Sequence, residues 1–275
     1  MKRVIAFLMT VMFAFMMIGC NQKQEDTTET QSSSEETTVA NINEDNPKPS
    51  TEEPKKEEND KKSEKNNPSK RVIVIDPGHG VNGNKGMEKQ SPDSNKMKIK
   101  DPGGAQGNTT GTPEYRVNLK VALKLKNLLE QNGMTVVMTK NTEKEAPGNI
   151  ERAEVGNKNN AALEIRIHCD SSTNSKASGA SMLVPDEIGY VKNAASLSNR
   201  YGETILNTVV SEVGMHNRGV VKRNDMTGFN WSKVPVVLIE MGFMSNTTED
   251  KLLSTDNYQN KLAKGLCDGI IKCFA

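Results

Sequence analysis

The chain has 275 residues, of which 26% are charged and 4% aromatic, and its formal net charge is +1. Residues 71–275 carry a net charge of about +4, which lacks the strong basic excess typical of nucleic-acid binding, so no nucleic-acid partner is expected. Beyond the first 20 residues, no apolar run reaches the roughly 18 residues of a membrane span. A multi-pass membrane protein is therefore excluded.

Residues 1–20 form a short leader. Lys2 and Arg3 precede the apolar residues 4–18, which is typical of a secretory signal. The leader ends at Gly19-Cys20 and resembles a bacterial lipobox, which implies cleavage and lipidation at Cys20. We expect a protein exported and anchored through this lipid to the outer face of the cytoplasmic membrane. An uncleaved anchor and ordinary secretion remain alternatives, and both also export the chain.

Residues 21–70 have a different composition. They contain eight Lys and thirteen Asp or Glu, with very few apolar residues. Such a segment buries too little surface to offset its chain entropy, so we predict a disordered polar linker. The remaining residues, 71–275, are enough for one globular core.

Strand and helix patterns alternate along residues 71–275. Short runs of β-branched and apolar residues predict strands at 71–76, 134–139, 163–168, 180–184 and 234–240. Apolar spacing and capping residues predict helices at about 113–131, 149–160, 190–213 and 257–273. This alternation indicates a single α/β domain with a mostly parallel twisted central sheet flanked by helices.

Three cysteines fall within this domain. Cys267 and Cys273 would occupy different faces of one predicted helix, too far apart to bridge easily. Cys169 follows a strand and is expected to be a small core residue on the face opposite His168. We therefore expect free thiols and no disulfide framework.

Chemically useful side chains follow three of the predicted strands. His79, His168 and Glu240 lie at or just past their carboxyl ends, where open α/β sheets bind ligands. Glu114 occupies the first turn of a predicted helix, on its apolar stripe. Complementarity to the helix dipole explains such an acid on its own. With two histidines, however, one carboxylate and an open fourth position make a typical catalytic zinc set.

Other polar residues accompany this set. Asp76 and Asp170 would either orient the histidines or serve turn geometry. Arg166 shares the strand face of the nearby histidine by alternation. We expect it to contact substrate or the carboxylate of Glu240, although an ion pair with Glu164 explains it equally well.

Five motifs occur in a fixed order: Asp76-Pro77-Gly78-His79-Gly80, Glu114 with its helix, Ile167-His168-Cys169-Asp170, Arg218-Gly219-Val220, and the segment PVVLIEMGFMSN at 235–246. Together they resemble the zinc-dependent N-acetylmuramoyl-L-alanine amidases of the amidase type 3 family, over essentially all of 71–275. The resemblance implies that His79, Glu114 and His168 bind Zn²⁺ and that Glu240 is the catalytic acid/base. It also implies peptidoglycan as the partner and substrate.

The expected function is hydrolysis of the amide between N-acetylmuramic acid and the L-alanine of the stem peptide. Alternatives are an exported zinc peptidase acting within the stem peptide and a non-catalytic lipoprotein binding module. We expect a monomer. The polar, aperiodic residues 81–100 lengthen the segment before Glu114, and we expect a long loop there. It would be disordered, form a rim or lid over the metal, or contact glycan.

Overall fold

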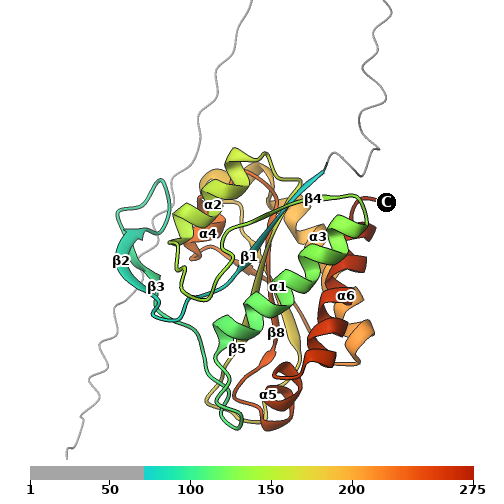
Figure 1. Cartoon of the computed structure of the whole chain (residues 1–275). Helices are drawn as coiled ribbons and strands as arrows, with labels where there is room; N and C mark the ends of the chain where they lie inside the picture. The colour runs from blue at the N-terminus through green and yellow to red at the C-terminus, as the bar shows by residue number, and fades with distance from the viewer. Residues whose placement is uncertain (1–70) are drawn as a thin grey trace, which may run out of the picture. The chain divides into compact units, whose positions relative to one another are not determined.

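The computed structural model describes residues 71–275 (Figure 1). The predicted leader, the lipidation site Cys20 and the linker at 21–70 lie outside the described residues. Within 71–275, no helix is both long and apolar enough to cross a membrane.

A six-stranded sheet forms the centre of the domain, in the order β4-β1-β5-β8-β6-β7. Neighbouring strands are parallel except at the β6–β8 pair, which is antiparallel. The mostly parallel sheet expected from the sequence is confirmed. Its strands are β1 (Val72–Pro77), β4 (Thr135–Met138), β5 (Leu163–Asp170), β6 (Ala180–Pro185), β7 (Asn217–Arg223) and β8 (Val236–Phe243).

Helices cover both faces of the sheet (Figure 1). The main core packs one face against α1 (Glu114–Gln131), α3 (Ala195–Val213) and α6 (Asp256–Lys272). Smaller apolar clusters pack the other face against α2 (Asn149–Lys158) and α4 (Thr227–Asn230). Successive residues of a strand point to opposite faces. The inner strands β1 and β8 are therefore largely apolar on both faces, whereas β5 contributes Leu163, Ile165 and Ile167 to the main core and turns Glu164, Arg166 and His168 to the other face. The α/β class predicted from the sequence is confirmed.

Residues 81–100 fold into a hairpin instead of the expected long loop. Its strands are β2 (Asn84–Lys89) and β3 (Met97–Asp101), paired antiparallel. Charged side chains point inward: Glu88 accepts hydrogen bonds from the backbone of Asn149 and Ile150 at the start of α2. Apolar residues such as Met87 instead point to solvent. The sequence of β3 alternates apolar and charged residues over only a few positions, with its apolar residues exposed, and β2 shows no such alternation, so the hairpin was not predicted.

Three further elements differ from the prediction. The edge strand β7 is mostly exposed and lacks alternation, and it went unpredicted. The helix α5 (Thr247–Leu253) was also missed, although Asn246 caps it through the backbone of Thr248 and Glu249. A separate 3-10 turn, η3 (Gly189–Asn193), replaces the start of the helix predicted at 190–213. Edge strands and short capped helices show only weak hydrophobic periodicity in the sequence, which makes them hard to predict.

A buried ion-pair network lies beneath the end of β1. The carboxylate of Asp76 contacts Arg152 at 2.6 Å and Arg166 at 2.7 Å, and both guanidinium groups are almost fully buried. Arg166 also donates to the side chain of Asn149. Among the described residues Arg166 forms no ion pair with Glu164 or Glu240, so the predicted ion pair with Glu164 is wrong. A contact of Arg166 with substrate stays a prediction.

Removing the acid of this network should destabilise the fold. We expect Asp76→Ala to lower the free energy of unfolding by about 3–5 kcal/mol, because two buried arginines lose their shared counter-ion. The arginines outweigh the effect of burial and hold the pKa of Asp76 well below its usual range. The ion pair thus stabilises the fold above the unfolded-state pKa of about 3.9 and is lost only as the pH falls far below that value. Urea unfolding at pH 7 measures the effect, and the exposed Asp93→Ala is the control.

Candidate metal centre

Three side chains predicted as metal ligands converge at one end of the sheet. His79 follows β1, Glu114 is the first residue of α1, and His168 lies near the end of β5. One ligand atom from each lies within 4.8 Å of the others. Glu114 Oε1 is 3.5 Å from His79 Nε2 and 3.1 Å from His168 Nδ1. The three residues, separated by up to 89 positions in the chain, form a group that can hold a metal ion.

Two glycines make room for this group. A Cβ atom at Gly78 would lie 2.1 Å from the ring of His168. A Cβ atom at Gly104 would lie 2.8 Å from Glu114 Oε2 and 2.9 Å from His79 Cδ2. Contacts this short are incompatible with any side chain at either position. Packing against the proposed ligand His168 therefore explains why the first motif has a glycine at position 78.

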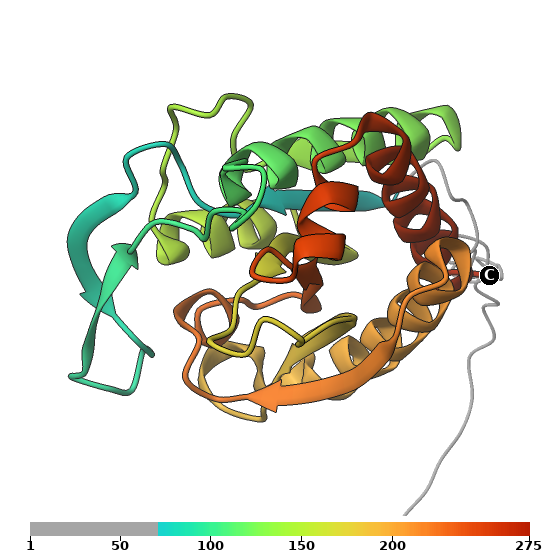
Figure 2. The ribbon, with the colours of Figure 1, turned by 90° about the horizontal axis from the view of Figure 1, so that it is seen from below.

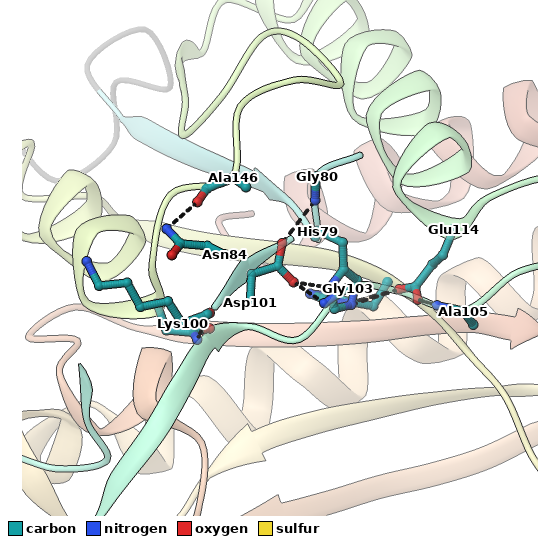
Figure 3. Close-up of polar contacts among 12 residues, drawn as sticks. His79, Gly80, Asn84, Lys100, Asp101, Gly103, Ala105, Glu114 and Ala146 are labelled. Carbon is teal, nitrogen blue, oxygen red and sulfur yellow. Dashed lines mark hydrogen bonds and ion pairs between the residues drawn. The ribbon is translucent and has the colours of Figure 1, made fainter. Parts of the chain in front are cut away.

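His79 is oriented by groups on both sides of its loop (Figure 3). Its backbone adopts φ 59°, in the left-handed region that costs energy for a residue with a side chain. The ammonium of Lys140 donates to the His79 carbonyl oxygen. Asp101 Oδ1 lies 2.6 Å from His79 Nδ1. The carboxylate accepts a hydrogen bond from the Nδ1–H group. Nε2 therefore carries the free lone pair of the ring, and it faces Glu114.

Asp101 is itself held in place. Its carboxylate accepts hydrogen bonds from the backbone N–H groups of Gly80, at 3.0 Å, and Gly103, at 3.0 Å. Burial opposes ionisation, but the hydrogen bond and charge of His79 outweigh it and lower the pKa of Asp101 to about 2. The acid is thus ionised at neutral pH and fixes both the imidazole and its loop.

Glu114 is the most heavily bonded of the three. Its Oε2 accepts from the backbone of Ala105 at 2.7 Å, and its Oε1 accepts from the backbone of Cys169 at 3.1 Å. The buried amide of Asn118, one turn further along α1, also donates to Oε1. These bonds fix the carboxylate on the apolar stripe of its helix. The position therefore serves the site, beyond simple complementarity to the helix dipole.

The protonation states suit a cation. Burial opposes the charge of Glu114, but its hydrogen bond with His168 and the nearby imidazoles lower its pKa to about 2. Burial also lowers the pKa of His168 to about 4, so its ring is neutral at pH 7. His168 Nε2 is buried without a hydrogen-bond partner among the described residues. The neutral imidazole of His168 with its unpartnered Nε2, the imidazole of His79 and the carboxylate of Glu114 form a donor set that fits a divalent metal.

Glu240 lies beside the group. It pairs with His168 in the parallel register of β8 and β5, so the two side chains share one face of the sheet. Its strand continues to Phe243, and Glu240 therefore lies within the strand and not at its end. Glu240 Oε2 is buried without a partner among the described residues. Burial, reinforced by the charges of Glu114 and Asp170, raises its pKa well above the ordinary value. A carboxyl group whose pKa is raised in this way is suited to accept a proton and return it.

The two acids expected to orient the histidines, Asp76 and Asp170, form other contacts. Asp76 belongs to the arginine network, and Asp170 accepts from the following backbone N–H of Ser171, as turn chemistry predicts. Asp101 orients His79, and Asn118 orients Glu114; neither was predicted. One signal was available for Asp101, because it begins a second Asp-Pro-Gly sequence in the domain. Cys169 is buried in the main core, as expected, and Cys267 and Cys273 are also free.

Weakening the contact between Asp101 and His79 should weaken metal binding. We expect Asp101→Asn to lower the metal affinity about 10–100-fold, because the neutral amide no longer fixes and polarises the imidazole. Competition with a chromogenic chelator measures this affinity, and the exposed Asp93→Asn on the same hairpin is the control. Equal affinities of Asp101→Asn and the wild type would show that the contact has no role in the metal centre.

The fold and this group of side chains define an α/β protein with a candidate metal centre of the hydrolase type. Residues 73–272 match the family model described as N-acetylmuramoyl-L-alanine amidase. The chain therefore belongs to this amidase family, and the class predicted from its sequence motifs is confirmed.

Individual relatives agree with this assignment. The chain is 28% identical to the N-acetylmuramoyl-L-alanine amidase AmiA of Escherichia coli, over 74% of this chain and 76% of the relative. It is also 28% identical to a germination-specific N-acetylmuramoyl-L-alanine amidase of Bacillus subtilis, over 75% and 81% of the two chains. Among solved structures, the catalytic domain of the amidase CwlV from Bacillus (Paenibacillus) polymyxa superposes with a TM-score of 0.59 at 26% identity, covering 74% of this chain and 97% of that one.

Proposed function

We propose that the protein is a zinc-dependent N-acetylmuramoyl-L-alanine amidase that binds one Zn²⁺ through His79, Glu114 and His168. The observation that carries the proposal is the convergence of these ligands next to the buried carboxyl group of Glu240. Zinc, when bound, acts as a Lewis acid that lowers the pKa of water and polarises a carbonyl oxygen. Two histidines and one carboxylate are a common ligand set for catalytic zinc.

Glu240 supplies the proton transfers in this proposal. It accepts a proton from the water that attacks the lactyl carbonyl carbon of muramic acid, and it then donates this proton to the nitrogen of L-alanine. The carbon–nitrogen bond breaks as the nitrogen becomes an amine. A raised pKa allows one group to act as base and then as acid. Asp101 and Asn118 hold two of the ligands in position throughout the reaction.

We also propose that the domain works outside the cytoplasmic membrane, attached through a lipid on Cys20. Support comes from the charged and apolar leader and from the cysteine at its end. The linker at 21–70 would give a root-mean-square reach of about 40 Å, which allows the domain to meet the cell wall from a membrane anchor. The proposed partner is peptidoglycan, and the proposed state is a monomer.

Digestion of purified cell wall tests the chemistry. The amidase should release intact stem peptides whose new N-terminus is L-alanine, and it should leave glycan strands without peptide. A peptidase acting within the stem peptide would instead leave L-alanine attached to muramic acid. Mass spectrometry and N-terminal labelling separate these outcomes. Wall fragments that all retain muramoyl-L-alanine would contradict the proposal.

A further inference from the structure

Two hollows are lined by residues 98–106, the segment whose Asp101 and Ala105 bond to His79 and Glu114, and they differ in chemistry. The first, called here the Gly104 groove, has a volume of about 380 Å³ and is lined mainly by Gly80, Asn82, Gly103, Gly104, Gln106 and Tyr115. None of its ten lining residues is charged. It reaches the ligands directly, since Gly104 packs against His79 and Glu114. The groove therefore offers backbone amides, side-chain amides and one aromatic ring beside the centre.

The second hollow, called here the Lys98 cleft, has a volume of about 360 Å³. It is lined by Lys98, Ile99, Pro102, Asn149, Met226 and Thr227. Its walls come from the β2–β3 hairpin on one side and from the starts of α2 and α4 on the other. It is more apolar than the Gly104 groove, and Lys98 is its one charged lining residue. Both volumes lie within the range of small-molecule sites.

One short segment separates the two hollows. Residues 103–106 line the Gly104 groove, whereas Pro102 lines the Lys98 cleft. Between these walls, Asp101 bonds to His79 and the backbone of Ala105 bonds to Glu114 (Figure 3). Figure 2 shows the hairpin standing to one side of the sheet, beyond the end of α1 that carries Glu114. A substrate held at the metal centre can thus extend in two directions.

In the described part of the chain, the charged lining residue of the Lys98 cleft lacks a close carboxylate partner. Lys98 Nζ donates to the backbone carbonyl of Asp225 at 2.7 Å and lies 3.9 Å from its carboxylate. That carboxylate already accepts from two nitrogens of the Arg223 guanidinium, Nε at 2.8 Å and Nη2 at 2.9 Å. Among residues 71–275, Lys98 therefore has no carboxylate of its own within hydrogen-bond distance. Arg223 also interacts with the charge of Glu240, which connects this edge of the cleft with the proposed acid/base.

The amide cut in the proposed reaction joins two chemically different parts. One is a glycan strand, whose sugars present neutral hydroxyl and acetamido groups. The other is a short peptide that begins with L-alanine and carries free carboxylates. Hydrogen-bonding groups and an aromatic ring suit the first part, whereas an apolar wall that carries the Lys98 ammonium suits the second.

We propose that the Gly104 groove binds the glycan strand and that the Lys98 cleft binds the acidic stem peptide, so that the substrate crosses the metal centre in one fixed direction. This inference rests on the proposed amidase function. It makes the hairpin, which the family motifs do not include, the peptide-binding wall of the site. Lys98 is then a specificity residue for the carboxylates of the stem peptide.

The two reaction products separate the two subsites without turnover. The full-length, zinc-loaded protein is titrated by calorimetry with a free stem peptide, and separately with glycan strands stripped of peptide. Lys98→Met should weaken binding of the peptide about fivefold and leave glycan binding unchanged, because one partly exposed charge contact is lost. Lys96→Met makes the same charge change at an exposed position on this hairpin and should alter neither affinity.

The Gly104 groove is tested in the same way. Tyr115→Ala and Asn82→Ala should each weaken glycan binding about fivefold while leaving peptide binding unchanged. Peptide affinity lost in these variants, or glycan affinity lost in Lys98→Met, would overturn the assignment. So would peptide binding that is equal in Lys98→Met and the wild type.

Failure of this inference is distinct from failure of the proposed function. If wild-type protein releases stem peptides with N-terminal L-alanine but the variants bind both products equally, only the subsite assignment is wrong. If wild-type protein does not hydrolyse cell wall at all, the amidase proposal fails first, and the subsite inference falls with it.

Discussion

Glu240→Gln is expected to lower kcat/KM for wall hydrolysis by about 10²–10⁴-fold while leaving zinc content unchanged. Glutamine preserves the size of the side chain but can neither accept the proton of the attacking water nor pass it to the leaving nitrogen. Glu240 pairs in register with His168 but is not one of the three converging ligand residues. Metal analysis and the rate of peptide release, measured on the same preparation, check both parts of the prediction.

A matched control is available for this substitution. Glu187→Gln makes the same change at an exposed residue outside the site, and it should leave the rate unchanged. Full activity of Glu240→Gln would remove Glu240 from the mechanism. Loss of zinc from the same variant would instead show that Glu240 supports the metal centre.

Loss of one ligand is expected to have the second large effect. His168→Ala should abolish hydrolysis and tight zinc binding, because one of the three ligands is gone. In the wild type, zinc at a thousandfold excess over its Kd should raise the free energy of unfolding by about 4 kcal/mol, since the ion binds only the folded state. His168→Ala should show almost none of this stabilisation. Urea unfolding with and without zinc provides the measurement.

The chain contains its own control for the ligand test. His216 is the third histidine of the sequence, and it is exposed. His216→Ala should retain both the stabilisation by zinc and the hydrolytic activity. Equal stabilisation of His168→Ala and the wild type by zinc would place the ion elsewhere.

Much of the fold was predictable because its inner strands are short runs of apolar and β-branched residues, continuous in β1 and β8 and alternating with polar residues in β5, and are bounded by turn residues. The ligand set was predictable for a related reason: histidines at strand ends and an acid on an apolar stripe are hard to explain by packing alone. His79, Glu114 and His168 therefore stood out before their distances were known. Edge strands and short capped helices, such as β7 and α5, carry weaker patterns and were missed.

The residues that support the ligands were harder to predict. Asp101 lies 22 positions after His79, and only the fold of the hairpin brings the two together. Strand alternation correctly placed Arg166 on the face of His168. It could not show that Asp76, from the neighbouring strand, would hold the guanidinium in the interior. Such contacts depend on which strands are neighbours, and local sequence does not contain that information.

The central claim is that residues far apart in the chain surround one zinc ion. Anomalous X-ray scattering from crystals of zinc-loaded protein, recorded on both sides of the zinc absorption edge, tests it most directly. We predict a single strong peak among His79, Glu114 and His168, on the side of the sheet that carries Glu240. A peak at another location, or none near these three side chains, would contradict the account.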